Sequence, residues 1–208
     1  GVEFDSWNRL TTDAGTTDGG PSNLWETGEL VVLTMTYDGG ALRIYKNGEL
    51  VDTNDDASGT FATWQDYHFL IGNELTNNRP FDGVIYDLMI WNGALTPLEV
   101  AFHSDAILDT VTDPLPPLAC HYDFSEQSGE WVYDRSGALD LKWHEHDGNI
   151  EWIDDVHGTG VYFDQDADGQ CVIETVDNDD TDELRDRIRD TDSITVQVFF
   201  IQDGGSTS

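Results

Sequence analysis

The chain has 208 residues, of which 42 are Asp or Glu and nine are Lys or Arg, so its formal charge is −33 at pH 7. Nucleic acids and anionic membranes bind largely through Lys and Arg, so a surface this acidic is a poor match for either. Strong acidity can also indicate disorder, but 38% of the residues are hydrophobic and 11% are aromatic, enough to form a core. No apolar run approaches the roughly 18 residues of a membrane span. We therefore expect a folded domain without membrane insertion and, because of its charge, without nucleic-acid partners.

The acidity is of a particular kind. Thirty of the 42 acidic residues are Asp, and Lys46 and Lys142 are the only lysines. A dense carboxylate surface stays hydrated in concentrated salt, where the Debye length shrinks to about 3 Å at 1 M. We interpret this composition as that of a protein from a halophile, with an acidic secreted protein as the alternative.

The chain has two cysteines, Cys120 and Cys171. Two cysteines allow at most one internal disulfide, and their spacing fits neither a zinc site nor a redox motif. The sequence does not decide between one disulfide and two buried thiols.

Several short runs in the first half of the chain alternate between apolar and polar residues, which is typical of antiparallel strands. They cover residues 30–36, 42–45, 49–52, 68–71 and 84–91. Asn47-Gly48 supplies the two positive-φ positions of a type I′ turn, so a hairpin is predicted there. After the last of these strands, Thr96 can cap a helix and Pro97 can take its first position, which predicts a short helix over residues 95–102.

Residues 106–117 contain three prolines and little periodicity, which predicts a linker. Beyond it, strand patterns return at residues 119–124, 156–163, 171–176 and 194–201. Leu184 and Ile188 lie four residues apart, which predicts a short amphipathic helix over 182–190 whose acidic first turn suits the helix dipole. The whole chain is therefore predicted to be all-β, with two short helices.

Four motifs stand before the linker: Tyr37-Asp38-Gly39-Gly40, Tyr45-Lys46-Asn47-Gly48, Ile71-Gly72-Asn73 and Phe81-Asp82-Gly83. Together they closely resemble the second half of a laminin-G-like, concanavalin A-like jelly-roll module. Two departures are Leu30, where the family often has Trp, and Tyr86, where it often has Asp. The resemblance implies an antiparallel β-sandwich with jelly-roll topology.

Motifs after the linker resemble the first half of the same module, so the two halves stand in reversed order. They include His121-Tyr122-Asp123-Phe124, Tyr133-Asp134-Arg135-Ser136-Gly137 and His146-Asp147-Gly148. We expect residues 1–105 and 118–208, joined by the linker 106–117, to form one circularly permuted sandwich with a shared core, because close termini make permutation tolerable. The alternative is a window on a tandem array, in which each half completes its sandwich with neighbouring copies.

Three carboxylates spaced two residues apart, Asp164, Asp166 and Asp168, precede Gly169 in the way that calcium loops present hard oxygen ligands. The glutamate that closes an EF-hand is absent, since its position holds Thr175, and a solvated hairpin tip is the alternative. The family resemblance makes Asp134 and Asp87 a second candidate, because related modules often bind structural calcium near their joined ends. Calcium is the only cofactor that we expect.

Concanavalin A-like glucanases carry their two catalytic acids along one strand, and this chain has no such strand. Glu151 and Asp154 come nearest, but their spacing does not put both on one face, so we expect no enzyme activity. Sugars in such folds stack on loop aromatics, and irregular stretches hold four candidates, Trp7, Trp25, Trp64 and Trp143. Because Trp is more often a core residue, we expect at most one or two of the four to be exposed.

The sequence thus predicts a noncatalytic, lectin-like binding or adhesion module on an extracellular, cell-surface or virion-surface protein of a halophile. Its expected partners are a glycan or surface polysaccharide and neighbouring copies of the module. The alternatives are a purely structural β-sandwich spacer in a surface fibre or tandem array and, more weakly, a glucanase-like enzyme.

Overall fold

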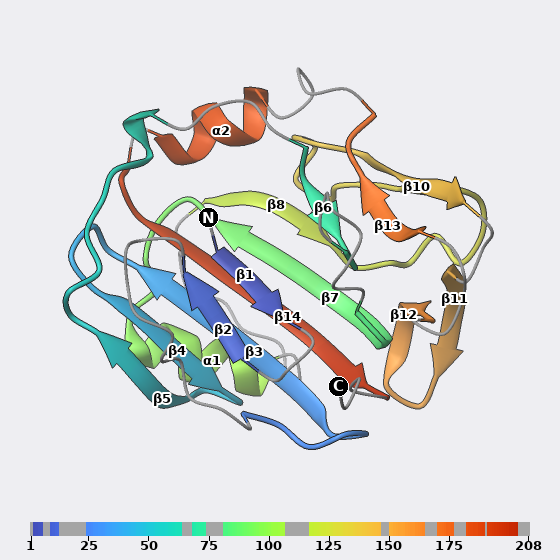
Figure 1. The fold of residues 1–208 in the computed structure, drawn as a ribbon, viewed down its shortest axis with the longest axis horizontal. Helices are drawn as coiled ribbons and strands as arrows, with labels where there is room; N and C mark the ends of the chain where they lie inside the picture. Colours follow the sequence, from blue (N-terminus) through green and yellow to red (C-terminus); the bar gives the residue numbers. More distant parts are fainter. Residues whose placement is uncertain are drawn as a thin grey trace.

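The protein folds as an antiparallel β-sandwich with two short α-helices (Figure 1). The computed structural model describes residues 2–5, 9–12, 24–63, 68–73, 81–106, 117–146, 150–164, 170–176, 182–189 and 191–203. The predicted all-β class is confirmed. Among the described residues, no helix has the length and apolar character needed to cross a membrane.

The main sheet has eight strands. They are β3 (Leu30–Tyr37), β4 (Leu42–Lys46), β5 (Glu49–Asn54), β7 (Gly83–Trp91), β8 (Leu118–Tyr122), β11 (Ile150–Asp155), β12 (Gly158–Phe163) and β14 (Ile194–Gln202). Their order is β11-β12-β7-β14-β3-β4-β5, and β8 pairs with β7 beside that path.

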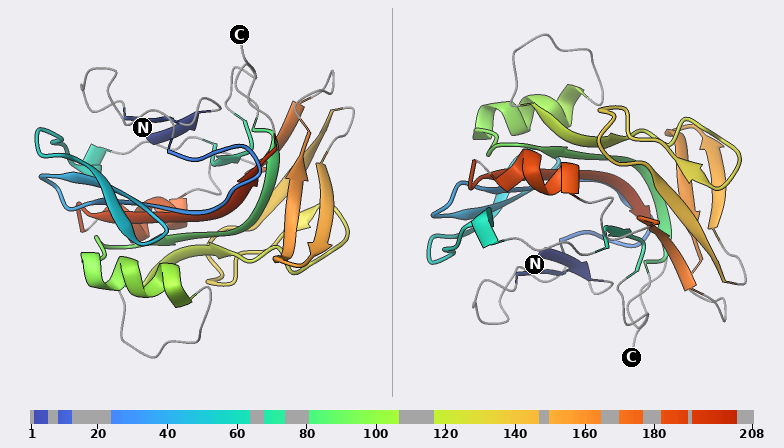
Figure 2. Two further views of the ribbon diagram at one scale, coloured as in Figure 1. Left: turned by 90° about the horizontal axis from the view of Figure 1, so that it is seen from below. Right: turned by 90° about the horizontal axis from the view of Figure 1, so that it is seen from above.

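A smaller sheet packs against the main one through a shared core. It has the order β6-β13-β10-β9, formed by β6 (Leu70–Ile71), β13 (Gln170–Glu174), β10 (Leu141–His146) and β9 (Trp131–Val132). A separate hairpin, β1 (Val2–Asp5) with β2 (Arg9–Thr12), lies on the opposite side of the main sheet from α1 (Pro97–Ala106) (Figure 2).

Strands from both sides of the 106–117 stretch alternate in the main sheet. β7 precedes this stretch in sequence, yet it lies between β12 and β14, which both follow it. The principal core cluster likewise combines Leu33 and Ile90 with Tyr122 and Phe163. The two segments therefore contribute to one sheet and one apolar core, and neither forms the sheet alone.

Local sequence signals explain the hairpin between β4 and β5 and the helix α1. Asn47 and Gly48 have φ values of 49° and 83°, as the predicted turn requires. At the start of α1, Thr96 and Glu99 form a reciprocal capping box, because each side chain accepts a hydrogen bond from the backbone N–H of the other, at 3.3 and 2.7 Å. A Cβ on Gly48 would lie 3.0 Å from Cα of Ala101, so the turn packs directly against the helix.

The second helix, α2 (Asp182–Arg189), buries the predicted pair Leu184 and Ile188 in the core. Near it, Cys120 is a fully buried free thiol, so the alternative of a disulfide with Cys171 does not hold. A 3₁₀ turn, η1 (Phe61–Thr63), completes the described elements. Five of the observed strands, β1, β2, β9, β10 and β11, were not predicted from the sequence.

Candidate functional site

A β-bulge interrupts β7 where its neighbour changes from β12 to β8. Along β14, Phe199 pairs with Asp87 and Phe200 with Ile85, so Tyr86 is the extra residue of the bulge. Along the edge that faces away from β14, β7 pairs with β12 as far as Ile85 and with β8 from Leu88 onward. Asp87 therefore lies at the junction of three strands.

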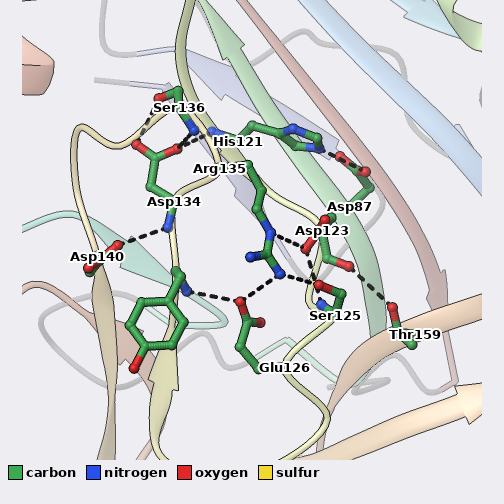
Figure 3. Close-up of polar contacts among 11 residues, drawn as sticks. Asp87, His121, Asp123, Ser125, Glu126, Asp134, Arg135, Ser136, Asp140 and Thr159 are labelled. Atoms are coloured by element: carbon green, nitrogen blue, oxygen red, sulfur yellow. Dashed lines mark hydrogen bonds and ion pairs between the residues drawn. The ribbon is translucent and has the colours of Figure 1, made fainter.

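At this junction Asp87 forms an ion pair with His121 of β8, with 3.2 Å between Oδ2 and Nε2 (Figure 3). Burial raises the pKa of Asp87, although the hydrogen bond from His121 acts in the opposite direction. Burial alone lowers the pKa of His121, but the carboxylates of Asp87, Asp123 and Asp134 outweigh it and raise that pKa overall. The pair thus joins β7 to β8 by an interaction that changes with protonation.

Beside this pair, the carboxylate of Asp134 organises the loop that follows β9. Its two oxygens accept hydrogen bonds from the backbone N–H groups of His121, Ser136, Ala138 and Leu139 and from the Ser136 hydroxyl, at 2.8 to 3.0 Å. The side chain is buried, so these donors satisfy a carboxylate that would otherwise be unfavourable there. The structure thereby gives Asp134 a role in holding the loop.

The guanidinium of Arg135 lies between two carboxylates (Figure 3). Its Nε is 2.9 Å from Asp123, and its Nη2 is 3.0 Å from Glu126 and donates to the Ser125 hydroxyl. Glu126, whose side chain is 8% exposed, also accepts a hydrogen bond of 3.3 Å from the backbone N–H of Tyr133. This network fixes the backbone on both sides of β9 and neutralises the Arg135 charge.

Two aromatic side chains are exposed at β9, the edge strand of the smaller sheet. Trp131 is 40% exposed and Tyr133 47%, whereas Val132 between them is fully buried. Tyr133 directly follows the strand, so the two exposed rings flank a buried residue at this edge of the sheet. They form a surface that we call the β9 aromatic face, defined by Trp131 and Tyr133.

Two of the tryptophans predicted to bind sugar, Trp25 and Trp143, belong to the described residues and make packing contacts. Trp25 is 4% exposed, its indole N–H donates to Gln202 at 2.6 Å, and its ring meets Phe200 edge to face, so the structure gives it a packing role. Trp143 is half-buried, packs against the core and lies next to Trp152, with 5.1 Å between ring centroids and 30° between the ring planes. Trp7 and Trp64 lie outside the described residues and stay predictions.

The residues predicted to bind calcium are not brought together where the structure describes them. Asp164 follows β12 directly, while Asp166 and Asp168 fall outside the described residues, so the calcium loop at 164–169 stays a prediction. Asp87 bonds to His121, and the carboxylate of Asp134 is occupied by N–H and O–H donors. Within the described part of the chain, no group of three or more His, Cys, Asp or Glu side chains is placed to hold a metal ion.

Residues 3–101 match the family model of the concanavalin A-like lectin/glucanases superfamily. The resemblance predicted from the motifs is confirmed over this segment, and the antiparallel β-sandwich is consistent with a concanavalin A-like fold. No curated protein and no solved structure matches the chain.

In this β-sandwich, the departure from the family pattern at Tyr86 has a structural consequence. The Tyr86 hydroxyl donates to Asp155 at 2.9 Å, and burial raises the pKa of the phenol, so the side chain anchors the β11–β12 hairpin to β7. Trp131, Tyr133 and Glu126 were missed as site residues. The only local signal was the alternation around Val132, which is too short to stand out from the neighbouring turn residues.

Proposed function

We propose that this concanavalin A-like module is a noncatalytic carbohydrate-binding or adhesion module of an extracellular, cell-surface or virion-surface protein of a halophile. The β9 aromatic face is the observation that carries the proposal. Exposed aromatic rings present a flat apolar surface on which the C–H face of a pyranose can lie, while polar groups nearby bind its hydroxyls. Glu130 and Lys142, which are 46% and 41% exposed at the side chain, stand beside Trp131 in that role.

Two features support a noncatalytic role. Two carboxylates close to the β9 aromatic face along the chain, those of Glu126 and Glu130, are each paired with a cation, at 3.0 and 3.2 Å. Glycosidases use two carboxyl groups that act together on one glycosidic bond, whereas these two are engaged by different cations, Arg135 and Lys142. Glu151 and Asp154 are three residues apart on β11, so they point to opposite faces of that strand.

The proposal is tested with a glycan array probed in molar KCl by the whole chain and by Trp131→Ala and Tyr133→Ala. An aromatic contact contributes about 0.5–1.5 kcal/mol, so each substitution should weaken affinity by roughly two- to tenfold. Phe102→Ala is the matched control, because Phe102 is an aromatic residue of α1 with 39% exposure. It should leave binding unchanged.

If no glycan binds in molar salt, the structural spacer becomes the better account of the module. If the chain hydrolyses a β-glucan, the glucanase-like alternative is restored. If glycans bind but Trp131→Ala binds as well as the unmodified chain, the module is a lectin whose site lies away from β9.

A further inference from the structure

We propose that the β9 aromatic face selects neutral glycans over those that carry carboxylates or sulfates, and that Glu130 sets this selectivity. The inference rests on the proposed function and names the ligand class of the same site. It follows from how the cations around the two rings are paired.

The cation nearest Trp131 is Lys142, on the neighbouring strand β10. Its Nζ lies 5.9 Å from the centroid of the Trp131 ring and 3.2 Å from a carboxylate oxygen of Glu130. Trp131 and Lys142 are direct cross-strand partners, and Trp143 donates its backbone N–H to the Glu130 carbonyl at 2.8 Å. The pairing of the strands therefore holds Glu130 beside Lys142, and the ammonium that could attract an anionic sugar is already neutralised.

Arg135 is the cation nearest Tyr133 along the chain, and two carboxylates outweigh its positive charge. Asp123 and Glu126 contact it at 2.9 and 3.0 Å, so one positive charge meets two negative charges. Their side chains are part of the network that holds the loop, and Glu126 is 8% exposed, so neither carboxylate can readily turn away. An anionic ligand on the β9 aromatic face would find no unpaired guanidinium here.

Four other basic side chains of the described surface are also paired with carboxylates, which lie within 3.2 Å of Arg43, Lys46, Arg185 and Arg187. Arg189 instead donates to the carbonyl oxygen of Ala62 at 3.1 Å. With a formal charge of −33, the whole molecule repels polyanions at long range. In molar salt that repulsion is screened beyond about 3 Å, so discrimination there must come from groups in direct contact with the ligand.

Glu130 and Lys142 are the charged side chains beside Trp131 that a bound sugar can contact. A neutral sugar can use both, because a hydroxyl donates to the carboxylate and accepts from the ammonium. A uronate or sulfate would have to break the Glu130–Lys142 pair and lie next to the displaced carboxylate, which is unfavourable. Removing the charge of Glu130 alone would free Lys142 to bind an anion.

The test uses two oligosaccharides of the same linkage, one neutral and one built of the corresponding uronate, titrated against the whole chain in molar KCl. The unmodified chain should bind the uronate at least tenfold more weakly than the neutral sugar. Glu130→Gln should strengthen uronate binding about tenfold and change neutral binding by less than about threefold. Glu49→Gln removes the same charge from the exposed edge strand β5 and should change neither affinity. Lys142→Met, which leaves Glu130 unpaired, should weaken uronate binding further.

Equal binding of the two sugars by the unmodified chain would overturn the selectivity while leaving the proposed function intact. An unchanged uronate affinity in Glu130→Gln, with the fold shown intact by circular dichroism, would overturn the role of Glu130. Absence of binding to any neutral glycan would overturn the proposed function itself.

Discussion

Asp134 is the residue on which the loop after β9 depends most, because one carboxylate satisfies five donors from four residues. Asp134→Ala should lower the free energy of unfolding by about 3–5 kcal/mol, since it leaves several buried N–H groups without acceptors. Chemical denaturation measures this. Asp186→Ala, which removes a carboxylate whose side chain is 65% exposed, should change stability by less than about 0.5 kcal/mol. Equal effects of the two substitutions would contradict the role given to Asp134.

The Asp87–His121 pair makes stability depend on pH. The pKa of His121 is raised above 6.5, so the folded chain holds this proton more tightly than the unfolded chain. The resulting stabilisation is complete below pH 6.5 and is lost as pH rises through the folded-state pKa. The free energy of unfolding should therefore fall as pH rises above 6.5 at constant salt. The raised pKa of Asp87 acts in the same direction at lower pH. The folded chain favours the neutral carboxyl, so stability also falls there as pH rises.

His121→Asn and Asp87→Asn should each flatten that decline. His103 is the internal comparison, because burial lowers its pKa, so its protonation opposes folding below pH 6.5. His103→Asn should therefore leave the slope above pH 6.5 unchanged. A slope that survives in both Asp87 and His121 variants would show that the ion pair does not link β7 to β8 in solution.

Among the elements, the contact between β7 and β14 joins the segments on the two sides of residues 106–117. Gly83 begins β7 with φ of 145°, and a Cβ there would overlap the carbonyl oxygen of Ile201 in β14. Gly83→Ala should lower the free energy of unfolding by about 2–4 kcal/mol through backbone strain and overpacking. Gly40→Ala, with its nearest neighbour 3.8 Å away, should change stability by less than about 0.5 kcal/mol. If denaturation shows no difference between them, the two strands do not pair as described.

The elements that could be predicted are those with complete local signals. Asn47-Gly48 and the Thr96–Glu99 box each encode a turn or a helix start in two to four residues, and the structure has both. By contrast, β10 and β11 are rich in charged residues and His, so they lack the apolar alternation of a strand. The strand conformation of β10 depends on pairing with β13, which is distant in sequence. That of β11 depends on pairing with β12, which follows it after a turn.

The candidate site was less predictable for the same reason. Asp87 and His121 are 34 residues apart and meet because β7 and β8 pair in a particular register. The exposure of Trp131 and the burial of Trp25 depend on which face each element turns to the core, and composition does not contain that information.

For the molecule as a whole, the formal charge of −33 dominates the response to salt. Added ions screen the repulsion between surface carboxylates, so the thermal midpoint should rise between low and molar KCl. Thermal melts at fixed pH measure this. An unchanged or falling midpoint would contradict the halophile interpretation, because a surface adapted to salt should gain from it.

Binding of a neutral glycan at the β9 aromatic face can be followed through the indole N–H resonances of the whole chain. The chain is titrated with a neutral oligosaccharide in molar KCl, and the Trp131 signal is assigned through Trp131→Phe. We predict that the Trp131 signal moves with ligand concentration, while the signals of Trp25 and Trp91, both buried, do not move. A Trp131 signal that stays fixed while the Trp7 or Trp64 signal moves would show that the glycan binds away from the β9 aromatic face.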